Sequence, residues 1–435
     1  MHTFATLEAG HQPLPHSQAF RKGPAAVLHL LCASLALYPL LERFIVPVLA
    51  AAFLLSATSV VGRLFANGLR TPPSFIWGAW GMFFAIYVFW FCVALIRQNP
   101  IAYINQDSFG FLLYIFAMPV LYLYIRWNRL EQQFFRFIEI CSWAIGLVSI
   151  ALVAGFFLMF GEINSDSMVF TNLFLRSLGL SWTIDHNHGM LGLYSNIAHL
   201  VLLGNALALH RYALHHRRKD LLLVLVCIAA LALDGRRALV ISAVLQLLII
   251  APRLMSALKP AHRILLLASA AVLTSAFVVT NLEWVEQRFE FSEEDVSTAL
   301  RQEQIPPLLE KIAENPVLGG GFGTVARLLR SQLRPFSYEV DFLATFMKLG
   351  MVGGLLYFGT YLFVVSRESL RCGARGIFYI SAGWAFFFFM GTNGNQAMST
   401  DSAIFHIFLF LLIAFSQVKP ARQPQARTTE PQAAA

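Results

Sequence analysis

The sequence has 435 residues, of which 57% are hydrophobic and only 13% are charged. A soluble domain usually carries about 25% charged residues, so this composition excludes an ordinary soluble protein and favours a chain that lies mostly in lipid. The formal net charge of +8 does not indicate nucleic acid, because basic residues of membrane proteins collect in cytoplasmic loops. The five cysteines are scattered, without the spacing of a disulfide framework or a metal site, so neither is expected.

Long apolar runs recur along the whole chain, and each is long enough to cross a bilayer as a helix. The alternating ten-residue segments typical of a membrane barrel are absent. We therefore predict an all-α, polytopic integral membrane protein with about 12 transmembrane helices. The predicted spans are 24–42, 44–62, 74–96, 109–125, 137–160, 189–209, 219–234, 237–252, 263–281, 341–366, 375–394 and 400–418.

The distribution of Lys and Arg predicts the orientation of these spans. The run HRYALHHRRKD at 210–220 is strongly basic, whereas the short segment 395–399 contains no Lys or Arg. By the positive-inside rule, both termini are then cytoplasmic. The predicted organisation is a cytoplasmic tail at 1–23, transmembrane helices 1–9 over 24–281, a periplasmic loop with amphipathic helices at 282–340, transmembrane helices 10–12 over 341–418, and a disordered cytoplasmic tail at 419–435.

Arginines on the outer side are the first candidate functional residues. Arg236 and Arg237 lie between two apolar spans with almost no loop to carry them into water. Such residues tend to line cavities, and a guanidinium suits phosphate oxygens; alternatively, both snorkel to the interface as helix-end anchors. The same alternatives apply to Arg176, within an outer segment (161–188) that reads as an interfacial helix or a re-entrant piece. The run DHNH at 185–188 matches no metal motif, and a polar loop before a helix explains it equally well.

The outer loop 282–340 combines a helical half with a glycine-rich half. Residues 282–309 read as one or two amphipathic helices, with an acidic helix start at 292–295. Asn315-Pro316 is expected to end the helix, and the following GGGFG provides a backbone that can approach a ligand closely.

Two acids stand where the chain re-enters the membrane. Glu339 or Asp341 could take a proton from a sugar hydroxyl as a general base. Alternatively, these acids cap the next helix or pair with Arg334 and Lys348. Lys348 lies two turns into a predicted span, a depth that requires a polar cavity.

Several of these features resemble one family. Asn315, Pro316, Gly319 and Gly321 match an Asn-Pro-x-x-Gly-x-Gly stretch, and the turn at 235–237 is similar to a short Ser-Arg turn, with Gly in place of Ser. Together with twelve spans and a large outer loop between the ninth and tenth, the chain resembles the O-antigen ligase and O-antigen polymerase superfamily. These are bacterial inner-membrane glycosyltransferases of the GT-C type.

The resemblance implies a metal-independent enzyme without cofactors, whose active site faces the periplasm. The donor would be a glycan on undecaprenyl diphosphate, and the acceptor another glycan or lipid A core; a chain-length regulator protein is a further partner that it leaves open. Arg236, with Arg176, Arg237 and Arg334, would bind the diphosphate and stabilise the charge of the leaving group. Glu339 or Asp341 would activate the acceptor hydroxyl.

One departure from the family favours a polymerase. Ligases of this family carry a His just before the tenth span, but this sequence has no His between His262 and His406. The expected function is therefore an O-antigen or exopolysaccharide polymerase, with an O-antigen ligase as the alternative. A transporter or flippase of lipid-linked oligosaccharide is an alternative of another class, although most charges lie at span ends and related halves are not evident. A non-catalytic membrane scaffold is the remaining alternative.

Overall fold

The structure is a computed structural model, and it describes residues 15–37, 42–67, 75–161, 165–177, 183–187, 190–194, 198–234, 237–256, 296–328, 334–371, 381–384 and 400–416. This part of the chain is mostly helical, which confirms the all-α prediction, with one two-stranded hairpin as the exception. The elements are α1 Pro15–Leu37, α2 Glu42–Asn67, α3 Phe75–Ile96, α4 Ile101–Asn128, α5 Glu131–Phe160, α6 Ser165–Ser177, β1 Thr183–Asn187, β2 Met190–Tyr194, α7 Ala198–His215, α8 Arg218–Leu233, α9 Arg237–Ser256, α12 Val296–Glu314, α13 Asp341–Arg371 and α15 Thr400–Ser416.

Four helices in the described residues are long and apolar enough to cross a membrane: α3, α4, α5 and α13. The shorter apolar helices, which lie in α1, α2, α9 and α15, coincide with further predicted spans. The ninth predicted span, 263–281, lies outside the described residues, as does most of the eleventh. The chain is therefore a helical protein suited to a membrane, and the count of twelve spans remains a prediction.

The sixth predicted span, 189–209, was wrong at its start. Residues Met190–Tyr194 form strand β2, which pairs antiparallel with β1, and the helix begins only at Ala198. The run MLGLY is apolar, and a short apolar run does not distinguish a strand from a helix. Gly192 within this run weakens a helix, so pairing with β1 prevails.

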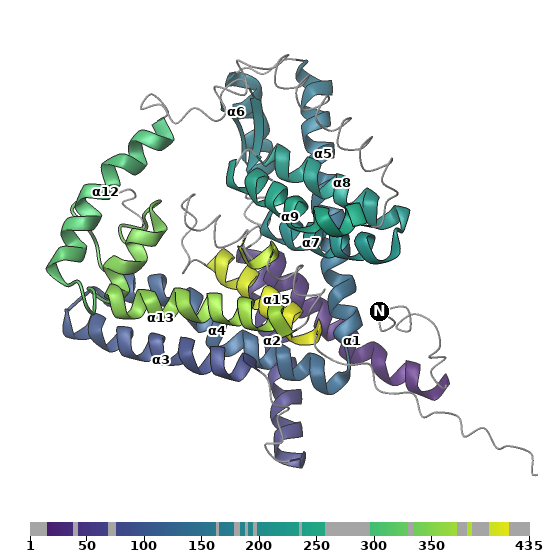
Figure 1. Cartoon of the computed structure of the whole chain (residues 1–435), viewed down its shortest axis with the longest axis horizontal. Coiled ribbons are helices and arrows are strands. Elements are labelled where there is room, and N and C mark those ends of the chain that lie inside the picture. Colours follow the sequence, from purple (N-terminus) through teal and green to yellow (C-terminus); the bar gives the residue numbers. More distant parts are fainter. Residues whose placement is uncertain are drawn as a thin grey trace, which may run out of the picture.

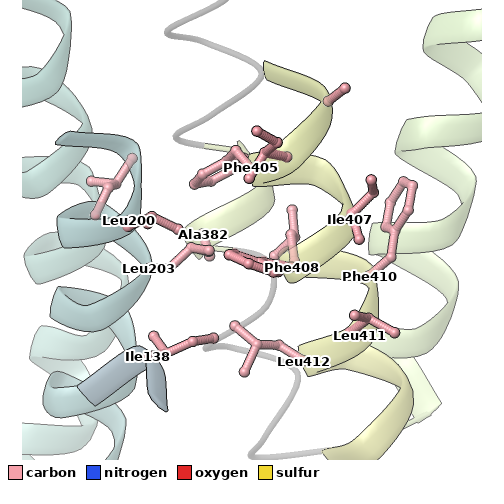
Figure 2. Close-up of a cluster of buried hydrophobic side chains, with 14 of the residues drawn as sticks. Ile138, Leu200, Leu203, Ala382, Phe405, Ile407, Phe408, Phe410, Leu411 and Leu412 are labelled. Atoms are coloured by element: carbon pink, nitrogen blue, oxygen red, sulfur yellow. The ribbon is translucent and has the colours of Figure 1, made fainter. Parts of the chain in front are cut away.

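The core of the bundle is organised around α15. Every side chain from Ala403 to Phe415 is buried, as expected for a helix that is apolar on all sides. Figure 2 shows Phe405 and Phe408 directed toward Leu200 and Leu203 of α7. Helix α15 also packs against α3, α4 and α13, and α3, α4 and α13 run side by side in Figure 1.

Helix α4 has polar contacts with other segments near both of its ends. Near its last turn, Arg63 of α2 donates hydrogen bonds to Trp127 O (2.9 Å) and Asn128 Oδ1 (2.7 Å). At its first turn, the chain connecting it to α3 contacts the loop that follows α12. A helix of 28 residues is roughly 42 Å long. The structure therefore separates the basic segment at Arg63 from the loop after α12, as the orientation prediction requires; which end faces the periplasm remains a prediction.

Helix α13 is broken at Gly350, whose backbone dihedral angles are φ 63° and ψ −176°. A continuous helix would join the amides at 351 and 352 to the carbonyls at 347 and 348. All four groups instead bond to the glycine-rich loop at 316–321, so none is left without a partner in the membrane protein's interior. The bonds are Gly320 N to Met347 O (3.0 Å), Gly321 N to Lys348 O (2.8 Å), Met351 N to Pro316 O (2.8 Å) and Val352 N to Val317 O (3.2 Å).

The glycines of this loop allow two backbones to approach each other. Gly321 has a positive φ of 81°, and a Cβ atom there would lie 2.5 Å from Ala94 Cα of α3. A Cβ atom on Gly350 would lie 2.3 Å from Val317 O. The sequence predicted that the glycines of the GGGFG run approach a ligand. In the structure, Gly321 of this run approaches helix α3 of the protein itself.

We predict that Gly321→Ala destabilises the protein, because alanine is strained at this φ and its Cβ would meet the backbone of α3. The strain alone is worth about 1–3 kcal/mol. Thermal unfolding in detergent measures the change, and Gly359→Ala is the control, because a Cβ atom at Gly359 on α13 would meet nothing within 4 Å. Equal midpoints for the two variants would contradict the close packing of the loop.

Candidate functional site

The candidate site lies at the end of the α3–α4–α13 group where α12 and the described residues that follow it, 315–328 and 334–340, meet these helices (Figure 1). The connection between α3 and α4 holds the loop in place. Asn99 Nδ2 donates to Gly320 O and to Phe322 O, at 2.9 Å each, and Arg97 hydrogen-bonds to Asn315 Oδ1. Asn315, predicted as part of a loop motif, therefore follows the last residue of α12 and bonds this end of α12 to the connection between α3 and α4.

A buried ion pair joins α4 to α13 beneath this loop. Lys348 Nζ lies 2.6 Å from Asp107 Oδ1, and the two side chains are only 3% and 2% exposed. The second oxygen, Asp107 Oδ2, accepts a hydrogen bond from Gly323 N at 2.7 Å. Lys348 Nζ also lies 5.7 Å from the centre of the Phe336 ring, within the range of a cation–π interaction.

This ion pair identifies the partner of Lys348. We expected a lysine at this depth to face a polar cavity, or to pair with Glu339 or Asp341. The structure pairs it instead with Asp107, a residue that we had not singled out. Asp107 lies among NQDS at the start of α4, where Asn105 and Gln106 are exposed and Asp107 is buried. An acid and a lysine each about two turns inside apolar helices were the available signal, because buried charges in membranes usually pair with one another.

Glu339 is held at the edge of the buried pair by α12. Its Oε2 lies 3.1 Å from Arg301 Nε, with the side chains of Arg301 and Glu339 31% and 17% exposed. Its backbone N–H donates to Gln304 Oε1 at 2.8 Å. Glu339 is therefore oriented by α12, and its side chain remains partly exposed. A partly exposed carboxylate can come within reach of a substrate hydroxyl, as a general base requires.

Two residues close to Glu339 in the sequence, Tyr338 and Asp341, are more deeply buried. Asp341 opens α13 and is 5% exposed, a position where an acid favours the helix dipole. Tyr338 is 1% exposed, and its hydroxyl accepts a hydrogen bond from Ala326 N at 2.6 Å. Burial raises the pKa of Tyr338, so its phenol stays protonated and cannot act as a base at neutral pH. Among the described acids at this end of α13, Glu339 is the more accessible candidate base.

The predicted diphosphate-binding arginines are not brought together with the acids by the described contacts. Arg176 is exposed in the last turn of α6, which packs on β1. Arg237 is the first residue of α9, but its side chain is not among those that the structure describes. Arg236 lies outside the described residues. Arg334 alone lies near the acids, on the turn that precedes Glu339, and it is exposed. The side chains of 185–188 also lie outside the description.

The site thus offers a partly exposed carboxylate beside a guanidinium, at the end of an apolar helix. The amides of Gly319, Gly320, Gly321 and Gly323 all bond to groups of the protein itself, so these glycines do not form a preformed cradle for phosphate. No protein-family model matches the chain, and no curated protein matches it. The chemistry of the site must therefore be argued from these residues.

We predict that Lys348→Met destabilises the protein strongly, because it leaves the Asp107 carboxylate buried without its cation. Breaking one partner of a buried pair costs about 3–5 kcal/mol. The double variant Asp107→Asn/Lys348→Met should recover much of this loss, since Asn Oδ1 can still accept from Gly323 N. Thermal unfolding in detergent tests both variants.

The control for this prediction is Arg301→Gln, which removes one partner of the partly exposed Glu339 pair. An exposed pair is worth about 0–1 kcal/mol, so this change should be small. A double variant that is no more stable than Lys348→Met would contradict the account of the buried pair.

Proposed function

We propose that the chain is a membrane-embedded glycosyltransferase that transfers or polymerises glycan units carried on undecaprenyl diphosphate, at the periplasmic face of a bacterial inner membrane. The observation that carries the proposal is the position of Glu339: a partly exposed carboxylate, held by Arg301 and Gln304, next to the first residue of the apolar helix α13. The proposed orientation puts this end of α13 at the periplasmic face. A lipid-linked donor would present its reacting carbon at this level, because its diphosphate lies at the boundary between hydrocarbon and water.

In the proposed reaction, a hydroxyl oxygen of the acceptor sugar attacks the anomeric carbon of the donor. Glu339 accepts the proton of that hydroxyl as the new C–O bond forms. The bond between the anomeric carbon and the phosphate oxygen breaks, and the diphosphate leaves with the electron pair. Cationic side chains stabilise the leaving group electrostatically. Arg301 lies 3.1 Å from Glu339, and Arg176, Arg236, Arg237 and Arg334 remain proposed ligands. A polymerase is preferred over a ligase because the family's His before the tenth span is missing.

A transporter of lipid-linked oligosaccharide is the second candidate, and the break in α13 favours it. Discontinuous helices in transporters leave backbone groups free to bind substrate or ions. At Gly350, however, the freed groups bond to residues 316–321, so the break carries less weight here than in a transporter with an open binding site.

We predict that Glu339→Gln abolishes long-chain glycan without loss of the protein from the membrane, because glutamine keeps the size of the side chain but cannot accept the proton. A general base typically contributes about 10²–10⁴-fold to the rate. Glycan profiles of a deletion strain complemented with each variant measure this effect. Glu314→Gln is the control, because Glu314 is an exposed acid that pairs with Lys311 near the same loop. Arg236→Ala should also fail to restore long chains if it binds the donor.

The same profiles separate the alternatives. A polymerase defect leaves single repeat units, whereas a ligase defect leaves long lipid-linked chains that are not attached at the surface. A transport defect would leave the lipid-linked units on the cytoplasmic side. Full restoration of long chains by Glu339→Gln would contradict the proposed base.

A further inference from the structure

Helix α6 exposes a face that is more apolar than the face it buries. Four large apolar side chains point outward, and each is more than half exposed: Val169 58%, Phe170 55%, Leu173 60% and Phe174 52%. Its inward face is mixed: it includes Ser167, Thr171 and Asn172 together with Leu175 and the partly buried Met168. A helix at a water-exposed surface has the opposite arrangement, with its apolar stripe toward the core.

Asn172, on the inward face of α6, is hydrogen-bonded to the β-hairpin. Asn172 Oδ1 accepts a hydrogen bond from Ile184 N at 2.6 Å, and Asn172 Nδ2 donates to Ile184 O at 2.7 Å. Both hydrogen-bonding groups of the amide are thus used by a single residue of β1, which fixes the rotation of the helix about its axis. The outward direction of the apolar face therefore follows from specific contacts.

The apolar face of α6 continues the lipid-facing surface of α5. Phe170 packs on Phe160, with ring centres 6.0 Å apart. The last turns of α5, a candidate membrane span, expose Leu158 (88%) and Met159 (69%). Figure 1 shows α6 beside the end of α5. Large apolar side chains that are exposed on a spanning helix contact acyl chains, so the neighbouring face of α6 meets the same environment.

The length of α6 excludes a spanning role. Its 13 residues make a helix of roughly 20 Å, shorter than the ~30 Å hydrocarbon core. A short helix with one apolar face lies in the plane of the interface, with that face in the acyl chains.

We propose that α6 is an interfacial anchor that binds bilayer lipid, with Phe170, Leu173 and their neighbours among the acyl chains. The contact holds α6, and the β-hairpin bonded to it, at the membrane surface at the end of α5. It requires only that α5 spans the membrane and does not depend on the proposed enzymatic activity.

The test places a fluorescent NBD label on a single cysteine, in a variant whose five native cysteines are replaced. The protein is reconstituted in phosphatidylcholine vesicles, with and without lipids brominated on the acyl chain. Leu173→Cys should give blue-shifted emission that is quenched by brominated lipid, to an extent comparable with Leu158→Cys on α5. The aqueous reference is Glu314→Cys, because Glu314 is 55% exposed on the loop side of α12; its label should not be quenched.

Two results would overturn the proposal. Leu173→Cys that behaves like Glu314→Cys would place the face in water, and a label that is shielded from both water and brominated lipid would mean that protein, such as a second copy, covers it. A photo-reactive amino acid at position 173 in the otherwise unchanged chain gives an independent answer without cysteine replacement. Lipid adducts are expected there, and protein adducts alone would contradict the proposal.

Discussion

The buried pair between Asp107 and Lys348 is the interaction on which this end of the molecule depends. Two charges removed from water are costly unless each is paired and its remaining hydrogen-bonding groups are satisfied. Here one carboxylate oxygen accepts from Lys348 and the other from the backbone of Gly323. The same carboxylate therefore joins α4, α13 and the glycine-rich loop, and its position requires all three to be docked at once.

This arrangement gives a physical reason for the broken helix. With α13 interrupted at Gly350, the loop at 316–321 can pair with the carbonyls and amides that the break releases. The amides of Gly320 and Gly321 therefore bond to the carbonyls that the break leaves without helical partners. The loop also bonds to the chain that follows it, because Ala326 N donates a hydrogen bond to the hydroxyl of Tyr338. The next residue, Glu339, lies against α12. Glu339 is partly exposed, whereas the Asp107–Lys348 pair beside the loop is buried.

Hydrophobic runs and local breakers predicted much of the fold. The end of α12 at Glu314 follows from Asn315-Pro316, and α13 begins at Asp341 as expected, because both boundaries depend on neighbouring residues. The partner of Lys348 could not be predicted in this way, since Asp107 lies 241 positions away in the sequence and only the packing of α4 on α13 brings them together. The hairpin at β1 and β2 was missed because five apolar residues carry no clear periodicity. Glu339 was identified as a candidate base, but its support by Arg301 depends on the tertiary position of α12.

Hydrogen exchange of the loop amides tests the central claim most directly, because it reports whether the loop is bonded to α13. In the protein reconstituted in lipid nanodiscs, the amides of Gly320, Gly321 and Gly323 should be protected at least as strongly as those of Met351 and Val352. The three glycine amides bond to acceptors on the buried residues Met347, Lys348 and Asp107. Local opening should therefore be rare. Rapid exchange of these amides in a folded protein would show that the loop is free, and would contradict the docking of the site on the Asp107–Lys348 pair.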